Sequence, residues 1–142
     1  MDAWLGEMET TTIEVRTGDR EAVVDITAAA AGFVSDCGGD GLLHVFVPHA
    51  TAGIAILETG SGSDDGLLAA LRELLPADDR WRHAHGSRGH GRSHVMPALV
   101  PPYCTVPVVD GRLALGTWQS ICLVDLNVDN PVRSVRLSLL RG

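Results

Sequence analysis

The sequence predicts an α+β fold, with one domain built on a mostly antiparallel β-sheet and two helices. Short alternating runs of polar and apolar residues indicate about seven or eight strands, and the helical segments do not alternate regularly with them as they do around a parallel sheet. The chain of 142 residues is 45% hydrophobic, so it can form a core without disulfides. We therefore expect a single domain over residues 1–142, with residues 1–10 as an N-terminal tail.

The strands are expected where apolar residues alternate or run together, at residues 10–16, 21–26, 42–47, 54–57, 105–109, 112–115, 120–126 and 133–140. The first is expected at a sheet edge, and the near-continuous apolar run at 42–47 is the best candidate for a central strand. A hairpin is expected at residues 105–115, because Asp110 and Gly111 suit the positive-φ positions of a two-residue turn.

Two helices are expected. The first begins at Thr27, whose hydroxyl can serve as an N-cap, and ends before Gly38. The second is expected to be capped by Asp64 or Asp65. It carries leucines at helical spacing on one face and ends at Pro76.

Composition argues against several classes of function. The net charge of −7 argues against a nucleic-acid partner, because neutralising phosphates needs a basic face. No apolar run reaches the roughly 18 residues of a membrane span, and the first residues lack the pattern of a signal peptide. The three cysteines show no Cys-x-x-Cys pair, which indicates reduced thiols and a cytoplasmic location.

A basic segment at residues 80–94 stands out in this acidic chain. Its arginines and histidines are Arg80, Arg82, Arg88, Arg92, His83, His85, His90 and His94. Guanidinium groups grip phosphate oxygens in pairs, so the segment is typical of a rim that binds a small phosphorylated metabolite. The alternative is a solvated, flexible loop, which Gly86, Gly89 and Gly91 favour.

Three histidines in separate segments are candidates for a shared site. His49, His83 and His94 each lie at the edge of a predicted strand or turn. Three imidazoles can hold a divalent metal ion, zinc or magnesium, and leave a position open for water or substrate. The same side chains could instead bind phosphate, move protons near neutral pH or make structural hydrogen bonds.

Further candidates lie close to these histidines in the sequence. Glu58 follows the strand expected at 54–57, where it could be a general base, a magnesium ligand or a partner that orients a histidine; the alternative is an exposed glutamate at a strand end. Thr51 and Gly53 form a turn whose hydroxyl and N–H groups could hold an oxyanion. Arg82 could hold a phosphate.

The residues that follow the hairpin bring a glycine and three polar groups to one place. They are Gly116, Thr117, Trp118 and Gln119. Glycine allows close approach of a ligand, and Trp118 could stack on a heteroaromatic ring while Thr117 and Gln119 hydrogen-bond to it. The alternative for Trp118 is packing in the core.

The segment TVPVVDGRLALGTWQSI at residues 105–121 closely resembles the YjbQ family, whose members are described as uncharacterised or as secondary thiamine-phosphate synthases. Three shorter segments agree with the family pattern, namely HATAGI at 49–54 with Glu58 after it, WRH at 81–83 and SH at 93–94. The resemblance extends from about residue 13 to residue 140.

This resemblance implies an enzyme that joins a hydroxymethylpyrimidine diphosphate to a thiazole phosphate and releases diphosphate, as a main or a side activity. It implies His49, His83 and His94 as the polar centre, with Glu58 as base or metal partner. A divalent metal or basic groups such as Arg82 would stabilise the departing diphosphate. Residues 116–119 would line the floor of the site, and a homotrimer is expected.

One departure from the family pattern keeps an alternative open. The family commonly has Asn-Glu-Asn followed by Asp where this chain has Leu-Glu-Thr-Gly-Ser at residues 57–61. If the missing amides and acid serve catalysis, the chain is instead a non-catalytic trimeric protein that binds a metal or a phosphorylated metabolite.

Overall fold

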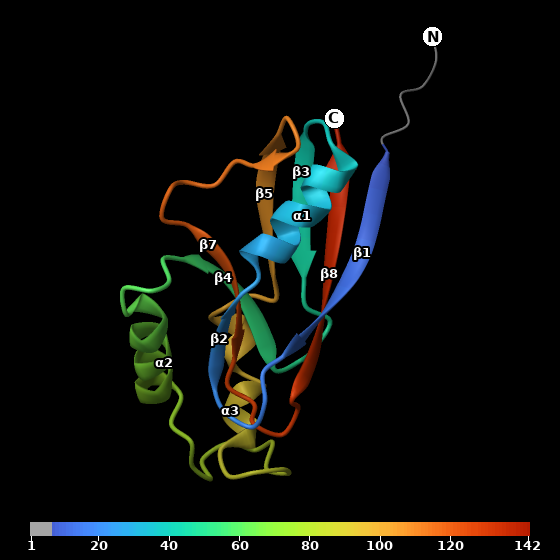
Figure 1. Ribbon diagram of the computed structural model, residues 1–142. Coiled ribbons are helices and arrows are strands. Elements are labelled where there is room, and N and C mark those ends of the chain that lie inside the picture. The colour runs from blue at the N-terminus through green and yellow to red at the C-terminus, as the bar shows by residue number, and fades with distance from the viewer. Residues whose placement is uncertain (1–6) are drawn as a thin grey trace.

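Eight strands form two antiparallel sheets in the computed structural model, which describes residues 7–142 (Figure 1). The strands are β1 (Met8–Arg16), β2 (Ala22–Asp25), β3 (Gly41–Phe46), β4 (Ala52–Leu57), β5 (Tyr103–Val109), β6 (Arg112–Leu113), β7 (Ser120–Asp125) and β8 (Val132–Arg141). The five-stranded sheet has the order β1-β8-β3-β5-β6, and the three-stranded sheet has the order β2-β7-β4. The α+β class and the antiparallel pairing are confirmed, but the strands divide between two sheets.

The positions of the strands agree closely with the sequence pattern. β1 lies at a sheet edge and β3 at the centre of the five-stranded sheet, as expected. Asp110 and Gly111 have φ of 50° and 71°, which are the values that the hairpin turn requires. The expected tail at residues 1–10 lies partly outside the described residues, and Met8 to Thr10 belong to β1.

The structure has α1 (Thr27–Cys37), α2 (Ser63–Leu74), the short α3 (His90–Ser93) and a 3₁₀ turn at Met96–Ala98, so the prediction of two helices is wrong by one. α3 lies inside the glycine-rich basic segment. It is a single turn, with the N–H of Arg92 bonded to the carbonyl of Gly89 at 3.2 Å and the N–H of His94 bonded to that of Gly91 at 3.2 Å. Such a short turn has too few residues to show helical periodicity.

The predicted helix caps are also wrong. Asp25 Oδ1 accepts the N–H of Thr27 at 2.9 Å, and the Thr27 hydroxyl accepts the N–H of Ile121 in β7 at 2.8 Å. Asp64 and Asp65 lie in the first turn of α2, where a glycine occupies the N-cap. Their charges there favour the positive end of the helix dipole without capping it.

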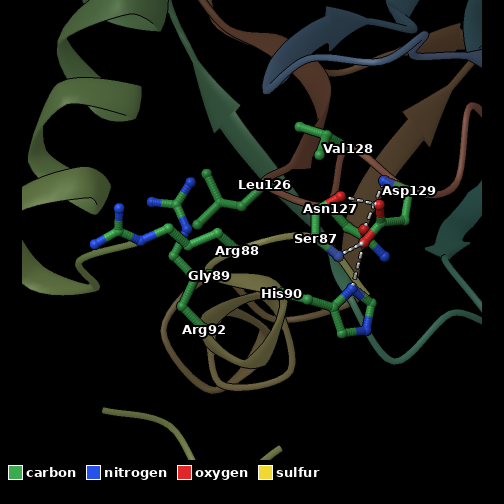
Figure 2. A pocket seen from close by; sticks show the side chains of 9 residues that line it. All are labelled: Ser87, Arg88, Gly89, His90, Arg92, Leu126, Asn127, Val128 and Asp129. Atoms are coloured by element: carbon green, nitrogen blue, oxygen red, sulfur yellow. Dashed lines mark hydrogen bonds and ion pairs between the residues drawn. The ribbon is translucent and has the colours of Figure 1, made fainter. Parts of the chain in front are cut away.

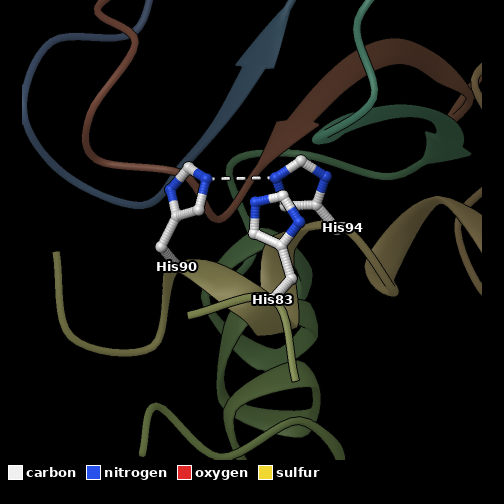
Figure 3. A group of neighbouring side chains, drawn as sticks. All are labelled: His83, His90 and His94. Atoms are coloured by element: carbon white, nitrogen blue, oxygen red, sulfur yellow. Dashed lines mark hydrogen bonds between the residues drawn. The ribbon is translucent and has the colours of Figure 1, made fainter. Parts of the chain in front are cut away.

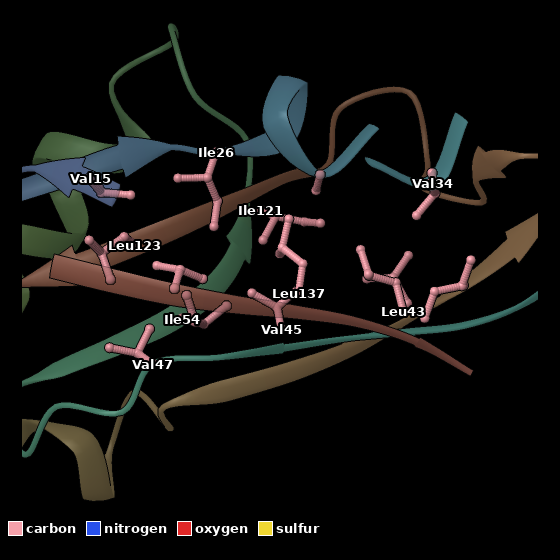
Figure 4. Packing of buried hydrophobic residues seen from close by; sticks show 14 of the residues in the cluster. Val15, Ile26, Val34, Leu43, Val45, Val47, Ile54, Ile121, Leu123 and Leu137 are labelled. Carbon is pink, nitrogen blue, oxygen red and sulfur yellow. The ribbon is translucent and has the colours of Figure 1, made fainter. Parts of the chain in front are cut away.

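The main core lies between α1 and the inner faces of both sheets (Figure 4). β7 is buried on both faces, because Ile121 and Leu123 face this core while Val124 joins a second cluster formed with α2. That burial explains the continuous apolar run seen in its sequence. The strand ends at Asp125, so a fully buried carboxylate sits at one end of the small sheet.

The three-stranded sheet separates two ends of the molecule. β4 runs antiparallel to β7, with Ala52 opposite Asp125 and Leu57 opposite Ser120. We call the Asp125 side, which carries α3, the histidine end, and the Ser120 side the tryptophan end; Figure 1 shows α3 and the segment before β7 at opposite ends of β7. A strand of this length spans about 20 Å.

None of the helices within residues 7–142 has the length and apolar character needed to cross a membrane. All three cysteines are free thiols. Burial raises the pKa of Cys104 to about 11 and is the main cause that raises the pKa of Cys122 to about 12. Cys37 is the last residue of α1 and donates to Glu9 Oε2 at 2.7 Å. These thiols are therefore unsuited to act as nucleophiles.

Candidate functional site

Three imidazoles gather at the histidine end (Figure 3). One ring nitrogen from each of His83, His90 and His94 lies within 4.8 Å of the others. Nε2 of His90 and Nε2 of His94 face each other at 3.0 Å, and the rings of His83 and His94 stack with centroids 3.7 Å apart. His90 begins α3 and His94 follows its last residue, so the two are neighbours on one side of this turn.

Gly91 allows the third histidine to approach. A Cβ at Gly91 would lie 2.1 Å from the carbonyl oxygen of His83 and 2.5 Å from Cβ of Trp81. The segment that carries His83 therefore rests directly on the backbone of α3. The indole N–H of Trp81 donates to the carbonyl of Pro76 at 2.9 Å and fixes the start of this segment.

Arg92 anchors α3 to the rest of the fold. It is only 5% exposed, pairs with Glu21 through Nη2, and donates to the carbonyl of Leu75 at 3.1 Å. Arg92 is thus committed to structure and does not face a ligand. The prediction of a solvated, flexible loop is wrong for this part of the segment.

The other arginines of the segment are exposed. Arg80 pairs with Asp78 at 2.7 Å. Within residues 7–142, Arg82 and Arg88 make no ion pair, and Arg88 lines a small cavity of about 70 Å³ together with His83 and His90. These two exposed guanidinium groups come from the same segment as the imidazoles and are available to bind an anion.

Asp129 reaches the cluster from the loop after β7 (Figure 2). Its Oδ2 lies 2.9 Å from Nδ1 of His90, and it accepts the N–H of Ser87 at 3.0 Å. The Ser87 hydroxyl also donates to Oδ1. The hydrogen bonds from Ser87 are the main cause that lowers the pKa of Asp129, so the carboxylate is ionised near neutral pH.

The surroundings of His83 and His94 favour the neutral forms of these two imidazoles. Desolvation is the largest cause that lowers the pKa of His94, and the neighbouring His83, His90 and His85 add to it. The pKa of His83 is lowered in the same way, by desolvation and then by His85 and His90. Because a metal binds the neutral form of histidine, this environment suits metal ligation.

His49 does not join this cluster. Its Nε2 accepts the N–H of Ser134 at 3.0 Å. Desolvation, and then the nearby Arg133, lower the pKa of His49, while Asp125 opposes them. Of the predicted set His49, His83 and His94, the structure therefore brings together the last two, and His90 takes the third place. The spacing of His90 and His94, four residues apart, was the signal in the sequence that could have found this pair.

Thr51 and Gly53 are buried parts of the scaffold. The Thr51 hydroxyl accepts hydrogen bonds from Arg133 at 2.8 Å and Asn127 at 3.2 Å. A Cβ at Gly53 would lie 2.1 Å from the carbonyl oxygen of Val100, so glycine is needed there for close backbone packing. Neither residue faces an open oxyanion site in the described chain, in contrast to the prediction.

The remaining predicted site residues lie at the tryptophan end. Glu58 accepts a hydrogen bond from Ser61 at 3.1 Å beyond the end of β4. Gln119 Oε1 accepts the N–H of Gly116 at 2.7 Å and closes its own turn. Trp118 is 72% exposed, which excludes core packing within this chain. The length of β4 and β7 thus separates Glu58 and residues 116–119 from the histidine end.

The fold and the cluster define a small α+β protein with a candidate histidine-built metal centre. Residues 11–142 match the family model described as UPF0047 protein YjbQ-like, and the chain belongs to this family. The UPF0047 protein Rv2556c of Mycobacterium tuberculosis is 58% identical over 135 residues, which cover 95% of this chain and 100% of that protein. The resemblance found in the sequence is confirmed.

Two solved structures show the same fold. A YbjQ-like protein of unknown function from Sulfolobus solfataricus superposes with a TM-score of 0.89 at 26% identity, covering 97% of this chain and 100% of that one. A hypothetical protein from Aeropyrum pernix gives a TM-score of 0.84 at 34% identity, with 94% and 99% covered. The fold is therefore shared over nearly the whole chain.

Proposed function

We propose that the histidine end binds a divalent metal ion and acts on a small phosphorylated substrate. The observation that carries this proposal is the group of His83, His90 and His94, whose ring nitrogens lie within 4.8 Å of one another. Arg82 directly precedes His83 in the sequence. Arg88 lines a cavity together with His83 and His90. Candidate metal ligands and candidate phosphate-binding groups thus come from one segment of the chain.

The donor set fits zinc better than magnesium. Nitrogen atoms bound to tetrahedral zinc at about 2.0–2.1 Å lie about 3.3 Å apart, close to the 3.0 Å between the Nε2 atoms of His90 and His94. The exposed His83 can turn its ring to complete the set. Magnesium prefers oxygen ligands. When bound, a zinc ion would supply Lewis-acid stabilisation of phosphate oxygens at its open position.

The family resemblance supports a reaction of the secondary thiamine-phosphate synthase type. In it, the carbon–oxygen bond to diphosphate breaks and a carbon–nitrogen bond to the thiazole phosphate forms, so diphosphate leaves with the bonding electron pair. Arg82 and Arg88 would hold the departing diphosphate through paired hydrogen bonds. The activity is proposed as a main or a side reaction of this site.

A second candidate is a protein that binds the metal or a phosphorylated metabolite without catalysis. The position of Glu58 favours it, because the predicted base lies at the tryptophan end and hydrogen-bonds to Ser61. Without that carboxylate, the histidine end still holds metal ligands and arginines. Turnover separates the two candidates.

We also propose a homotrimer, as the family resemblance implies, in a reducing cytoplasmic location that fits the free thiols. An apolar patch on the outer face of the five-stranded sheet supports the assembly; it consists of the exposed side chains Met8, Leu42, Phe46, Tyr103, Val109 and Leu140. His44 stacks on two of these rings, with ring centroids 5.7 Å from Tyr103 and 6.5 Å from Phe46. Exposed patches of this kind commonly mark protein interfaces.

The experiment is a zinc titration of the purified chain followed by a turnover assay. We expect one zinc ion per chain in the wild type, its loss in H94Q, and its retention in H44Q, which removes a histidine on the sheet face. With zinc present, we expect thiamine phosphate and diphosphate from the two substrates, and a strong loss in R82Q but not in R20Q. Zinc binding without product would favour the binding protein. No zinc binding in the wild type would overturn the metal proposal.

A further inference from the structure

We propose that Asp129 is a positioning residue of the histidine cluster. It holds His90 in the orientation and tautomer that present the Nε2 lone pair toward His83 and His94. This inference deepens the proposed metal-binding function and rests on it. It also has consequences in the metal-free protein, which can be measured separately.

The contact between Asp129 and His90 defines where the ring proton lies. Oδ2 of Asp129 is 2.9 Å from Nδ1 of His90. An ionised carboxylate can only accept hydrogen bonds, so Nδ1 of His90 carries the proton and donates it to Oδ2. When the ring holds one proton, that proton is on Nδ1 and Nε2 carries the lone pair. Because the His90 side chain is only 7% exposed, its ring has little room to turn.

The unprotonated nitrogen points into the cluster. Nε2 of His90 lies 3.0 Å from Nε2 of His94 (Figure 3). With the lone pair on His90, Nε2–H of His94 donates across this gap in the metal-free chain. A zinc ion bound between the rings would take the place of that proton, since both nitrogens already face the same point. The direction set by Asp129 is therefore the direction that ligation requires.

A buried network holds Asp129 in place. The N–H of Asp129 donates to Oδ1 of Asn127 at 2.9 Å, and Nδ2 of Asn127 donates to the Thr51 hydroxyl at 3.2 Å. Thr51 also accepts a hydrogen bond from Arg133 at 2.8 Å, and Arg133 pairs with Asp125 at 2.6 Å. Four of these residues are almost fully buried. The chain of contacts runs from the end of β7 to the imidazoles.

Histidine ligands commonly donate their second ring N–H to a carboxylate, and loss of that partner typically lowers metal affinity about 10–100-fold. In this chain the carboxylate comes from a segment 39 residues away from the histidine that it contacts. The basic segment is therefore oriented by the loop after β7. Thr51, expected from the sequence to hold an oxyanion, supports this loop instead.

The test compares D129A, D129N and S87A. S87A is the matched control, because it removes the hydroxyl that donates to Oδ1 of Asp129 and leaves the contact of Oδ2 with His90. Long-range ¹H–¹⁵N NMR of the metal-free protein reports which nitrogen of His90 carries the proton. Competition with a chromogenic chelator gives the zinc Kd.

We expect the Nδ1–H tautomer of His90 in the wild type and in S87A, and a shift toward Nε2–H in D129A. The zinc Kd should rise about 10–100-fold in D129A and change little in S87A. D129N keeps an acceptor oxygen, so its zinc Kd should lie between those of S87A and D129A. If D129A does not fold, D129N takes its place in the comparison. An unchanged tautomer and Kd in both Asp129 variants would overturn the inference. A tautomer that depends on Asp129 with no zinc bound by any variant would instead overturn the proposed metal function.

Discussion

The two ends of the three-stranded sheet carry polar residues in opposite environments. At the histidine end, Asp125 and Arg133 are almost completely buried and fully engaged in hydrogen bonds. At the tryptophan end, Trp118 is 72% exposed, and among residues 7–142 the Gln119 side chain bonds only to Gly116 in its own turn. Burying charges is costly unless each is paired, so the histidine end is the part of this chain where side chains are held in fixed positions. Fixed side chains are what a ligand site requires.

The largest expected effect of a single change comes from breaking the buried pair. D125N leaves Arg133 buried without a counter-charge, so the free energy of unfolding should fall by about 3–5 kcal/mol in urea denaturation. E58Q at the tryptophan end removes a partly exposed charge and should change the free energy of unfolding by less than about 0.5 kcal/mol. Equal losses in the two variants would contradict the contrast between the ends.

The next effect concerns the close approach at α3. G91A places a methyl group 2.1 Å from the carbonyl of His83, so it should lower stability by about 1–3 kcal/mol and weaken zinc binding, because the segment with His83 must move away. G66A is the control, since a Cβ at Gly66 in α2 meets nothing within 4 Å and should stabilise the helix by about 0.5–1 kcal/mol. Chemical denaturation and the zinc Kd measure both. Full zinc affinity in G91A would show that zinc binding does not need the close contact between Gly91 and the segment with His83.

The two described tryptophans sharpen the comparison further. W81F removes the indole N–H that donates to the carbonyl of Pro76, so the free energy of unfolding should fall by about 0.5–1.5 kcal/mol. W118F removes an exposed indole and should change stability by less than about 0.5 kcal/mol. Thermal unfolding compares the two. A loss of more than about 2 kcal/mol in W118F would mean that a second chain covers this indole.

The smallest expected effect is a pH dependence at His49. Its pKa is lowered by desolvation and by Arg133, so below pH about 6.5 the unfolded chain binds the proton first and the folded state loses stability. The loss continues as the pH falls to the folded-state pKa, and there is no contribution above pH about 7. H49Q, whose amide oxygen can accept the N–H of Ser134, should show a flatter dependence between pH 7 and 5. An identical slope in both proteins would contradict this assignment.

Local patterns in the sequence were sufficient for most of the fold. The Asp110–Gly111 turn and the apolar run of β7 depend on neighbouring residues, and both were predicted. The division into two sheets was not predicted, because it depends on β2 pairing with β7, about 100 residues further along the chain. Similarly, Thr27 bonds to Ile121 rather than to its own helix.

The candidate site was predicted only in part for the same reason. His83 and His94 were found through motifs in their own segments. His90 was missed because α3 is a single turn among glycines, and Asp129 because nothing near it in the sequence indicates a partner in the basic segment. The sequence predicted one site formed by the histidines, Glu58 and residues 116–119. Within one chain these groups do not meet, because the full length of β4 and β7 lies between them.

The measurement that most directly tests the central claim is a crystal structure of the zinc-loaded protein with data collected at the zinc absorption edge. The account predicts an anomalous peak at the histidine end, about 2.0–2.1 Å from Nε2 of His90, Nε2 of His94 and one ring nitrogen of His83. His49 should keep its hydrogen bond to Ser134. A peak bound to His49 in place of His90, or no peak among the three histidines in protein that holds stoichiometric zinc, would contradict the account.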